Sequence, residues 1–200
     1  MVSLIRTVVV DDHPAMRAGL GAVLADAPDI EPTGAAASGA ELWPVIERTA
    51  PDVVLMDWHL PGDDGLVLCH RVKRRYPSIH VVLFSAYADE WLVLPALLAQ
   101  ADALLAKRAP ARTVHETLRS VMAGEQPEVT LTAEQREALS SQLPLEDVGI
   151  AGLLLLRTPL REIAARTGLS SAELGERVEQ ILTRMSAAYG PGVTFDRESA

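Results

Sequence analysis

Short apolar runs alternate with longer segments of helical periodicity from the N-terminus to about Gly124. This alternation predicts a parallel sheet covered by helices on both faces, which is a doubly wound α/β domain. The apolar runs that we expect to form its five strands are Ile5–Val10, Ile30–Ala36, Val53–Met56, Val81–Phe84 and Ala103–Ala106. The helices expected after them are Ala15–Leu24, Ala40–Arg48, Leu66–Tyr76, Glu90–Gln100 and Arg112–Met122.

The pattern changes after residue 124. Residues 125–142 are polar and read as a linker with one short helix, for which Thr132 and Gln135 form a possible capping box. Residues 143–189 contain no strand pattern and several helix boundaries. We therefore expect an α/β domain over 1–124, a small all-α domain over 143–189 and a loose tail over 190–200.

The helix boundaries in the second domain predict a helix-turn-helix. Thr158 and Pro159 indicate a helix start, because threonine caps helices and proline suits the first helical position. Gly168 indicates the end of that helix, and Ser170 with Glu173 forms a capping box that opens the next. Two helices joined by a tight turn that contains glycine form a helix-turn-helix.

Composition and charge limit the classes of function. The net charge of −9 and pI of about 5.0 argue against a chain that binds nucleic acid through overall basicity, so any such site must be local. No run approaches the roughly 18 apolar residues of a membrane span, and Met1–Val10 lacks the zones of a signal peptide. We expect a cytoplasmic protein, and the single cysteine, Cys69, cannot form an internal disulfide.

Acidic and polar side chains follow the expected strands. The segment Val53–Gly65, VVLMDWHLPGDDG, reaches Asp57 directly after an apolar strand, and the first strand is followed by Asp11 and Asp12. Ser85 and Lys107 end the fourth and fifth strands. In an open parallel sheet ligands bind beyond these strand ends, and crowded carboxylates are tolerated when Mg²⁺ lies among them. A lysine and a hydroxyl beside the metal suit a phosphoryl group.

The segments VVVDDHPAMRAGL, VVLMDWHLPGDDGL, VVLFSAYAD and ALLAK resemble the receiver domain of two-component response regulators, over roughly Val2 to Gly124. The resemblance implies a flavodoxin-like fold in which Asp57 accepts a phosphoryl group from the phosphohistidine of a sensor histidine kinase. It further implies that Asp12 binds Mg²⁺ directly and Asp11 directly or through water. The remaining implied roles are a metal ligand at the backbone carbonyl of His59, a phosphoryl partner in Lys107 and a hydrogen-bond donor in Ser85.

Each of these residues also has a purely structural interpretation. Asp12 could cap the helix that begins near Pro14, Lys107 could be a solvated lysine, and Ser85 a turn hydroxyl. We expect Asp63 and Asp64 to be turn and cap residues. Receiver domains commonly carry an aromatic residue three positions before the lysine, where this chain has Leu104; Tyr87 could substitute in part.

The fourth expected helix has more apolar residues than are needed for a single stripe that faces the core. We expect part of its surface to stay exposed in the monomer and to form a homodimer contact. The residues concerned are Trp91, Leu92, Leu94, Leu97 and Leu98.

Residues 143–185 resemble the helix-turn-helix output domain of NarL/LuxR-type regulators, through the segment REIAARTGLSSAELGERVEQIL. Members of that family generally carry lysine, asparagine and histidine along the recognition helix, where this chain has Gly175, Glu176 and Arg177. Five arginines against six acids between Leu143 and Met185 leave no basic excess for phosphate contacts.

Two hypotheses therefore stay open. In the first, the protein is a phosphorylation-controlled transcription factor that binds DNA through Ser171, Arg177 and Arg184. In the second, the helical domain contacts protein instead, with the LLLL run Leu153–Leu156 partly serving as an interface; that run could equally be the core of a short helix. We do not expect an enzyme, because the chain has no hydrolase motif and no glycine-rich loop after a strand.

Overall fold

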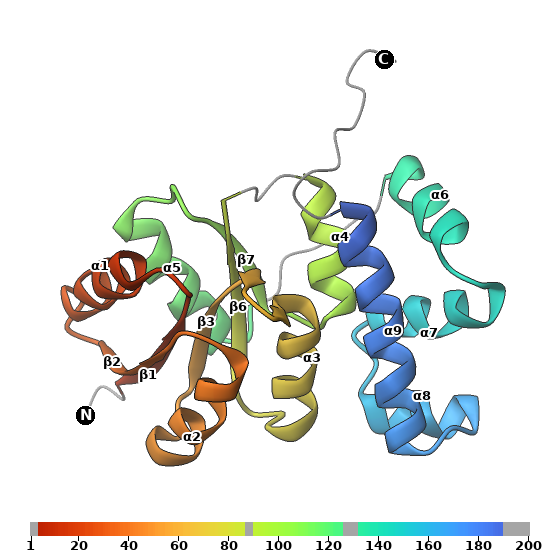
Figure 1. The fold of residues 1–200 in the computed structure, drawn as a ribbon, viewed down its shortest axis with the longest axis horizontal. Coiled ribbons are helices and arrows are strands. Elements are labelled where there is room, and N and C mark those ends of the chain that lie inside the picture. Colours follow the sequence, from red (N-terminus) through yellow and green to blue (C-terminus); the bar gives the residue numbers. More distant parts are fainter. Residues whose placement is uncertain (1–3, 87–89, 126–131, 190–200) are drawn as a thin grey trace, which may run out of the picture.

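The computed structural model describes residues 4–86, 90–125 and 132–189, shown as a coloured ribbon in Figure 1. Tyr87, part of the polar linker and the expected loose tail lie outside the described residues.

The first half of the chain forms a five-stranded parallel sheet with the order β2-β1-β3-β6-β7. Strand order reverses beside β1, so the ends of β1 and β3 flank the crevice in which such sheets bind ligands. A short β-hairpin, which was not predicted, follows β3. Its strands are β4 (His59–Leu60) and β5 (Asp63–Asp64), each of two residues. The sheet strands are β1 (Ile5–Val10), β2 (Ile30–Ala36), β3 (Val53–Asp57), β6 (His80–Ser85) and β7 (Ala103–Ala106).

Helices cover both faces of the sheet, as predicted. Alternate residues of β3 point to opposite faces: Leu55 joins the core beneath α1 and α5, whereas Met56 joins the core beneath α2, α3 and α4. This double coverage explains why β3 is apolar throughout before it reaches Asp57. The helices are α1 (Pro14–Ala25), α2 (Gly39–Thr49), α3 (Gly65–Arg75), α4 (Glu90–Leu98) and α5 (Ala111–Met122).

The second half is helical and consists of α6 (Ala133–Gln142), α7 (Leu145–Leu155), α8 (Leu160–Thr167) and α9 (Ser171–Tyr189). The capping boxes at Thr132 and Ser170 are both present. The helix start predicted at Thr158 and Pro159 is present, but Pro159 and not Thr158 is the N-cap of α8, and the Thr158 amide donates to the Leu153 carbonyl. No helix in the described ranges is long and apolar enough to cross a membrane.

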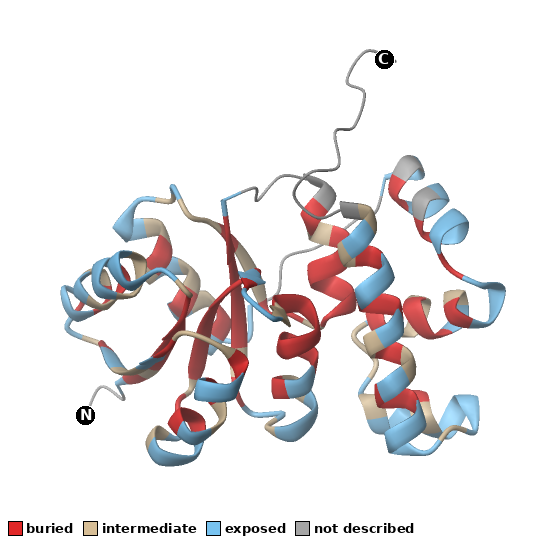
Figure 2. Cartoon of the chain, in the orientation of Figure 1, coloured by how far each residue is buried: buried red, intermediate tan, exposed pale blue. Residues whose placement is uncertain are grey.

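The two halves are packed together. Helix α9 lies against both α3 and α4, and α7 also contacts α4 (Figure 1). One hydrophobic cluster runs from β3 and α3 through Leu98 of α4 to Leu182 and Met185 of α9. The burial map shows this red core continuing from the sheet into the helical half (Figure 2). The receiver-like half and the helical half therefore share one core.

This shared core corrects the expectation of an exposed apolar surface on α4. The leucines predicted to form a dimer contact are buried within the chain, and α7 and α9 supply the cover. The side chain of Trp91 lies outside the described set. The buried residues are Leu92, Leu94, Leu97 and Leu98.

The LLLL run was interpreted either as the core of a short helix or as part of a protein interface, and its residues differ in burial. Leu154 is fully buried, Leu153 and Leu155 pack against the shared core, and Leu156 is 78% exposed. Most of the run is therefore core, and a single leucine is left at the surface.

We predict that Leu182→Ala, in α9, lowers the free energy of unfolding by about 2–5 kcal/mol because it leaves a cavity in the shared core. Leu156→Ala is the matched control and should change it by less than about 0.5 kcal/mol. Urea unfolding should be followed by tryptophan fluorescence, which reports only on residues 1–124, and by circular dichroism. An unchanged fluorescence midpoint in Leu182→Ala would show that the two halves unfold independently.

Candidate functional site

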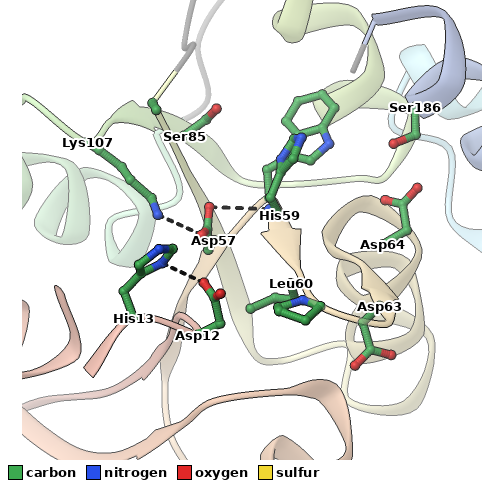
Figure 3. A pocket seen from close by; sticks show the side chains of 13 residues that line it. Asp12, His13, Asp57, His59, Leu60, Asp63, Asp64, Ser85, Lys107 and Ser186 are labelled. Atoms are coloured by element: carbon green, nitrogen blue, oxygen red, sulfur yellow. Dashed lines mark hydrogen bonds and ion pairs between the residues drawn. The ribbon is translucent and has the colours of Figure 1, made fainter. Parts of the chain in front are cut away.

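The acidic and basic residues predicted to meet beyond the strand ends do so. Figure 3 shows Asp57 at the end of β3, with Asp12 and His13 after β1, Ser85 at the end of β6 and Lys107 after β7. These side chains line one pocket of about 530 Å³. Parallel strands place these residues together because all their carboxyl ends lie at the same edge of the sheet.

Lys107 is the centre of the charge arrangement. Its Nζ lies 2.7 Å from Asp11 Oδ2 and 2.6 Å from Asp57 Oδ2, so one ammonium bridges two carboxylates. Asp11 and Asp57 are almost fully buried, at 1% and 4% exposure. The surface-lysine interpretation of Lys107 is therefore wrong, because its ammonium is committed to the two acids.

Burial raises the pKa of Asp57 above its usual value, although Lys107 and the His59 amide, 3.3 Å from Oδ1, both favour the ionised form. Burial would lower the pKa of Lys107, but the hydrogen bonds to Asp11 and Asp57 outweigh it and raise that pKa. Since the folded-state pKa of Asp57 exceeds the unfolded one, ionisation of Asp57 opposes folding at neutral pH. That unfavourable contribution decreases as the pH falls through the folded-state pKa and is gone below the unfolded-state pKa.

The acids suit a hard cation. Asp11, Asp12, His13 and Asp57 each offer a ligand atom, and these atoms all lie within 4.8 Å of one another. Oδ1 of Asp12 is shielded from solvent and lies 2.7 Å from His13 Nδ1 without a well-aligned hydrogen bond between them. Carboxylate oxygens are the ligands that Mg²⁺ prefers, so the residues fit that ion.

His13 was missed by the sequence reasoning. Its Nδ1 lies 2.7 Å from Asp12 Oδ1, and its amide donates to Asp11 at 2.8 Å. The N-cap of α1 is His13 and not Asp12, so the capping role considered for Asp12 is not observed. The adjacency DDH in the sequence was the available signal, but magnesium's preference for oxygen gave no reason to include the imidazole.

The loop after Asp57 is held by a close backbone approach. A side chain on Gly65 would meet the Asp57 carbonyl oxygen at 2.6 Å, so only glycine fits, and its amide donates to the Trp58 carbonyl. Asp64 caps α3 by accepting from the Leu66 amide, as expected for a cap residue, whereas Asp63, expected in a turn, lies in β5 and accepts from the Gly39 amide of α2. The β4–β5 hairpin pairs Asp64 with His59, whose carbonyl was predicted as a metal ligand.

Comparison with known proteins matches residues 7–119 to the response regulator receiver domain family. This chain belongs to that family. The response regulator is 31% identical over 191 residues to the transcriptional activator protein ExaE of Pseudomonas putida, covering 90% of this chain and 89% of ExaE. Its relatives thus include regulators of similar length.

Solved structures agree with the fold of this response regulator. The signal receiver domain of NarL from Mycobacterium tuberculosis is 30% identical, with a TM-score of 0.54, over 62% of this chain and 97% of that one. An RcsB–DNA complex superposes over 92% of both chains with a TM-score of 0.60; at 17% identity this likeness concerns the fold alone.

The helical half of the response regulator also reaches the acidic pocket. Ser186 of α9 lines the same pocket as Asp57, and Figure 3 shows it across from His59 beside Asp64. Trp58, directly after Asp57, is 2% exposed and shares the core cluster with Leu182 and Met185 of α9. Sequence reasoning could not find Ser186, because nothing in its local pattern points to a contact more than a hundred residues away.

The candidate DNA-contacting arginines are paired within the helical half. Arg177 forms ion pairs with Asp147 and Glu146 of α7, and Arg184 Nη1 lies 3.1 Å from Asp147. Ser171 is exposed at the start of α9. The two arginines thus hold α7 to α9, and neither is free as the structure stands.

Two further contacts join α9 to α3. Arg71 forms a bidentate ion pair with Glu179, at 3.0 and 2.7 Å. Gly175 is buried against Arg74, whose Cζ would lie 2.9 Å from a Cβ at that position. Arg74 of the receiver therefore packs against Gly175, the position at which NarL/LuxR-type regulators carry a lysine.

We predict that Lys107→Met lowers the free energy of unfolding by about 3 kcal/mol without Mg²⁺, because two buried carboxylates lose their cation. Saturating Mg²⁺ should restore a large part of that loss. Lys73→Met is the matched control, because Lys73 pairs with the buried Asp102 outside the acidic cluster. The stability that Lys73→Met loses should not depend on Mg²⁺. Urea unfolding with and without Mg²⁺ measures both, and equal losses in the two conditions for Lys107→Met would contradict the metal site.

Proposed function

We propose that this protein is a two-component response regulator that accepts a phosphoryl group on Asp57 from a sensor histidine kinase and controls transcription through its C-terminal helix-turn-helix. The observation that carries the proposal is the bridging of Asp11 and Asp57 by Lys107, with the carboxylate of Asp12 beside them. The chain's similarity to the activator ExaE over 90% of its length supports the transcriptional output.

The phosphoryl transfer uses groups already in place. A carboxylate oxygen of Asp57 attacks the phosphorus of the kinase phosphohistidine, an O–P bond forms and the P–N bond breaks, with its electron pair returning to the imidazole. Lys107, already 2.6 Å from Asp57, follows the phosphoryl oxygens, and the Ser85 hydroxyl lines the same pocket as a hydrogen-bond donor. Transfer therefore needs little movement of the lysine.

The metal would be Mg²⁺, held by Asp12, Asp11, Asp57 and the His59 carbonyl. When bound it supplies positive charge to the phosphoryl oxygens. Without it, Lys107 is the only nearby ammonium among the described residues for two buried carboxylates, and a third acid, Asp12, lies within reach. The local excess of negative charge is what gives the site its preference for a divalent cation.

We propose that the signal reaches α9 through Trp58 and Ser186. Leu104 occupies the position of the usual aromatic residue and packs at the edge of the core. Trp58 is covalently adjacent to Asp57 and lies in one core cluster with α9, and Ser186 faces the phosphoryl pocket. Phosphorylation changes the charge and volume of that pocket and so bears directly on the packing of α9.

DNA binding requires α9 to leave the receiver. The RcsB–DNA complex has the same overall fold, and α9 corresponds to the recognition helix of a helix-turn-helix. Here one side of α9 is covered by α3 and α4. We propose that phosphorylation favours an open arrangement, in which two copies of the protein pair and read a two-fold DNA site.

The alternative is a helical domain that acts on protein without binding DNA. Two observations favour this alternative. Arg177 and Arg184 are neutralised by Glu146 and Asp147, and Gly175 contacts the receiver. Phosphate contacts supply most nonspecific affinity for DNA, so arginines committed to acids weaken binding.

We predict that Asp57→Asn abolishes labelling of the protein by acetyl phosphate, because the amide cannot form an acyl phosphate. Asp63→Asn, which alters a partly exposed acid of the same pocket, is the matched control and should label normally. Labelling is measured by intact-protein mass spectrometry with Mg²⁺ present. Persistent labelling of Asp57→Asn would refute the assignment of the acceptor.

We predict that selection of genomic DNA fragments by the phosphorylated protein enriches a two-fold motif, and that Arg177→Ala loses this enrichment. Arg166→Ala is the matched control, since Arg166 is exposed on α8 and, among the described residues, pairs only with Glu162. Arg71→Ala removes an ion pair that closes α9 onto α3, so the unphosphorylated variant should bind the motif up to about fivefold more tightly than wild type. No enrichment at low salt would favour the protein-contacting alternative.

A further inference from the structure

A second pocket lies between the receiver and the helical half, away from Asp57. It has a volume of about 560 Å³ and is lined by α3 on one side and by the first turns of α8 and α9 on the other. Pockets that bind small molecules commonly have this size and lie between domains. Pro77, Leu160 and Leu174 give it apolar walls.

The pocket is positively charged in a protein whose net charge is −9. Four basic side chains line it, Lys73, Arg74, Arg157 and Arg161, against the single acid Asp102, which leaves an excess of three positive charges. Asp102 is already paired with Lys73 at 2.9 Å. Among the described residues, neither Arg74 nor Arg161 makes a side-chain hydrogen bond or ion pair, so two guanidinium groups remain uncommitted.

His70 of α3 also lines this pocket. It is fully buried, and both its ring nitrogens lack a hydrogen-bond partner among the described residues. Burial, with a smaller contribution from the nearby charge of Arg74, lowers the pKa of His70 to about 4, so the neutral ring can donate one hydrogen bond. A buried polar group without a partner is rare in proteins and calls for an explanation.

The helix ends reinforce the preference for an anion. The first turn of α9 contributes Ser171 and Leu174 to the wall, and that of α8 contributes Leu160 and Arg161. Helix N-termini carry partial positive charge and favour negatively charged ligands. The capping box at Ser170 satisfies part of the α9 terminus, so the guanidinium groups and His70 remain the principal donors.

We propose that this pocket binds a small organic anion bearing a phosphate group, held between the receiver and the helical half. Two guanidinium groups and an excess of positive charge favour a multiply charged acceptor with several oxygens, such as phosphate, over a single carboxylate. The apolar walls suit the organic part of the ligand, and the volume excludes a macromolecule from the interior.

Such a ligand would oppose output, a consequence that rests on the proposed function. Arg74 and His70 belong to the receiver, whereas Arg157 and Arg161 belong to the helical half. An anion that contacts both sides binds only when α9 is docked, so it stabilises the closed arrangement by mass action. The phosphorylated protein should then bind DNA more weakly in its presence.

The test uses full-length protein with EDTA, at constant ionic strength, titrated calorimetrically with sodium pyrophosphate and with AMP. We expect saturable binding at one site and a rise in Tm. Arg74→Gln and Arg161→Gln should each weaken binding about tenfold, the loss of one charge-assisted contact. Arg166→Gln, on the same helix as Arg161 but outside the pocket, is the matched control and should bind like wild type.

A second readout reports on the pocket directly. The ring resonances of His70 should shift on saturation, whereas those of His115, which contacts the Val23 carbonyl on the far face of the sheet, should not. Neither measurement involves DNA or phosphoryl transfer, so failure here is distinguishable from failure of the proposed function.

Three outcomes would overturn the proposal. The first is the absence of heat and Tm change with both anions into the millimolar range. The second is binding that survives both arginine substitutions, which would place the anion elsewhere. The third is weaker DNA binding by Arg74→Gln and Arg161→Gln when neither small anion binds, which would assign these cations to the DNA backbone.

Discussion

The apolar surface of α4 cannot be left in water, and its cover determines how the rest of the molecule is arranged. Four leucines of a nine-residue helix are buried, although one face of that helix is enough to pack against a sheet. Helices α7 and α9 cover the remainder, which places the helical half beside α3 and α4 and forms one core. The positions of Ser186 at the acidic pocket and of Gly175 beside Arg74 both follow from this packing.

The same constraint gives the unusual residues of α9 a structural reason. A lysine at position 175 would place a second positive charge against Arg74, whereas glycine leaves room for the guanidinium at a loss of helix propensity of about 1 kcal/mol. Glu179 faces Arg71, and Glu176 remains exposed. The contacts of α9 with the receiver therefore explain part of the difference between this sequence and the usual recognition-helix pattern. That difference does not by itself show that DNA binding has been lost.

Local patterns predicted all five sheet strands and the strand-end acids, because alternating apolar runs and parallel topology fix which residues share an edge. Asp57, Lys107 and Ser85 could be placed for this reason. What could not be predicted depends on contacts between distant segments. The excess leucines of α4 indicated a missing cover, but a second copy of the chain and the chain's own α9 satisfy the same apolar pattern. Likewise, Arg177 reads as a DNA contact until Glu146 and Asp147 are brought beside it.

The extent of this interface limits what phosphorylation can achieve alone. Burial of one leucine is worth about 1.5–3 kcal/mol, so separating α9 from several apolar partners is strongly unfavourable unless new contacts replace them. Moving an equilibrium from 1:99 to 99:1 already requires about 5.5 kcal/mol of differential stabilisation. In the proposed function, a phosphoryl group beside Trp58 and Ser186 loosens the packing, and pairing of two copies and DNA binding, which would both favour the open arrangement, would have to supply part of the difference. The size of the core that α9 completes is therefore the physical reason for proposing that output depends on phosphorylation, pairing and DNA together.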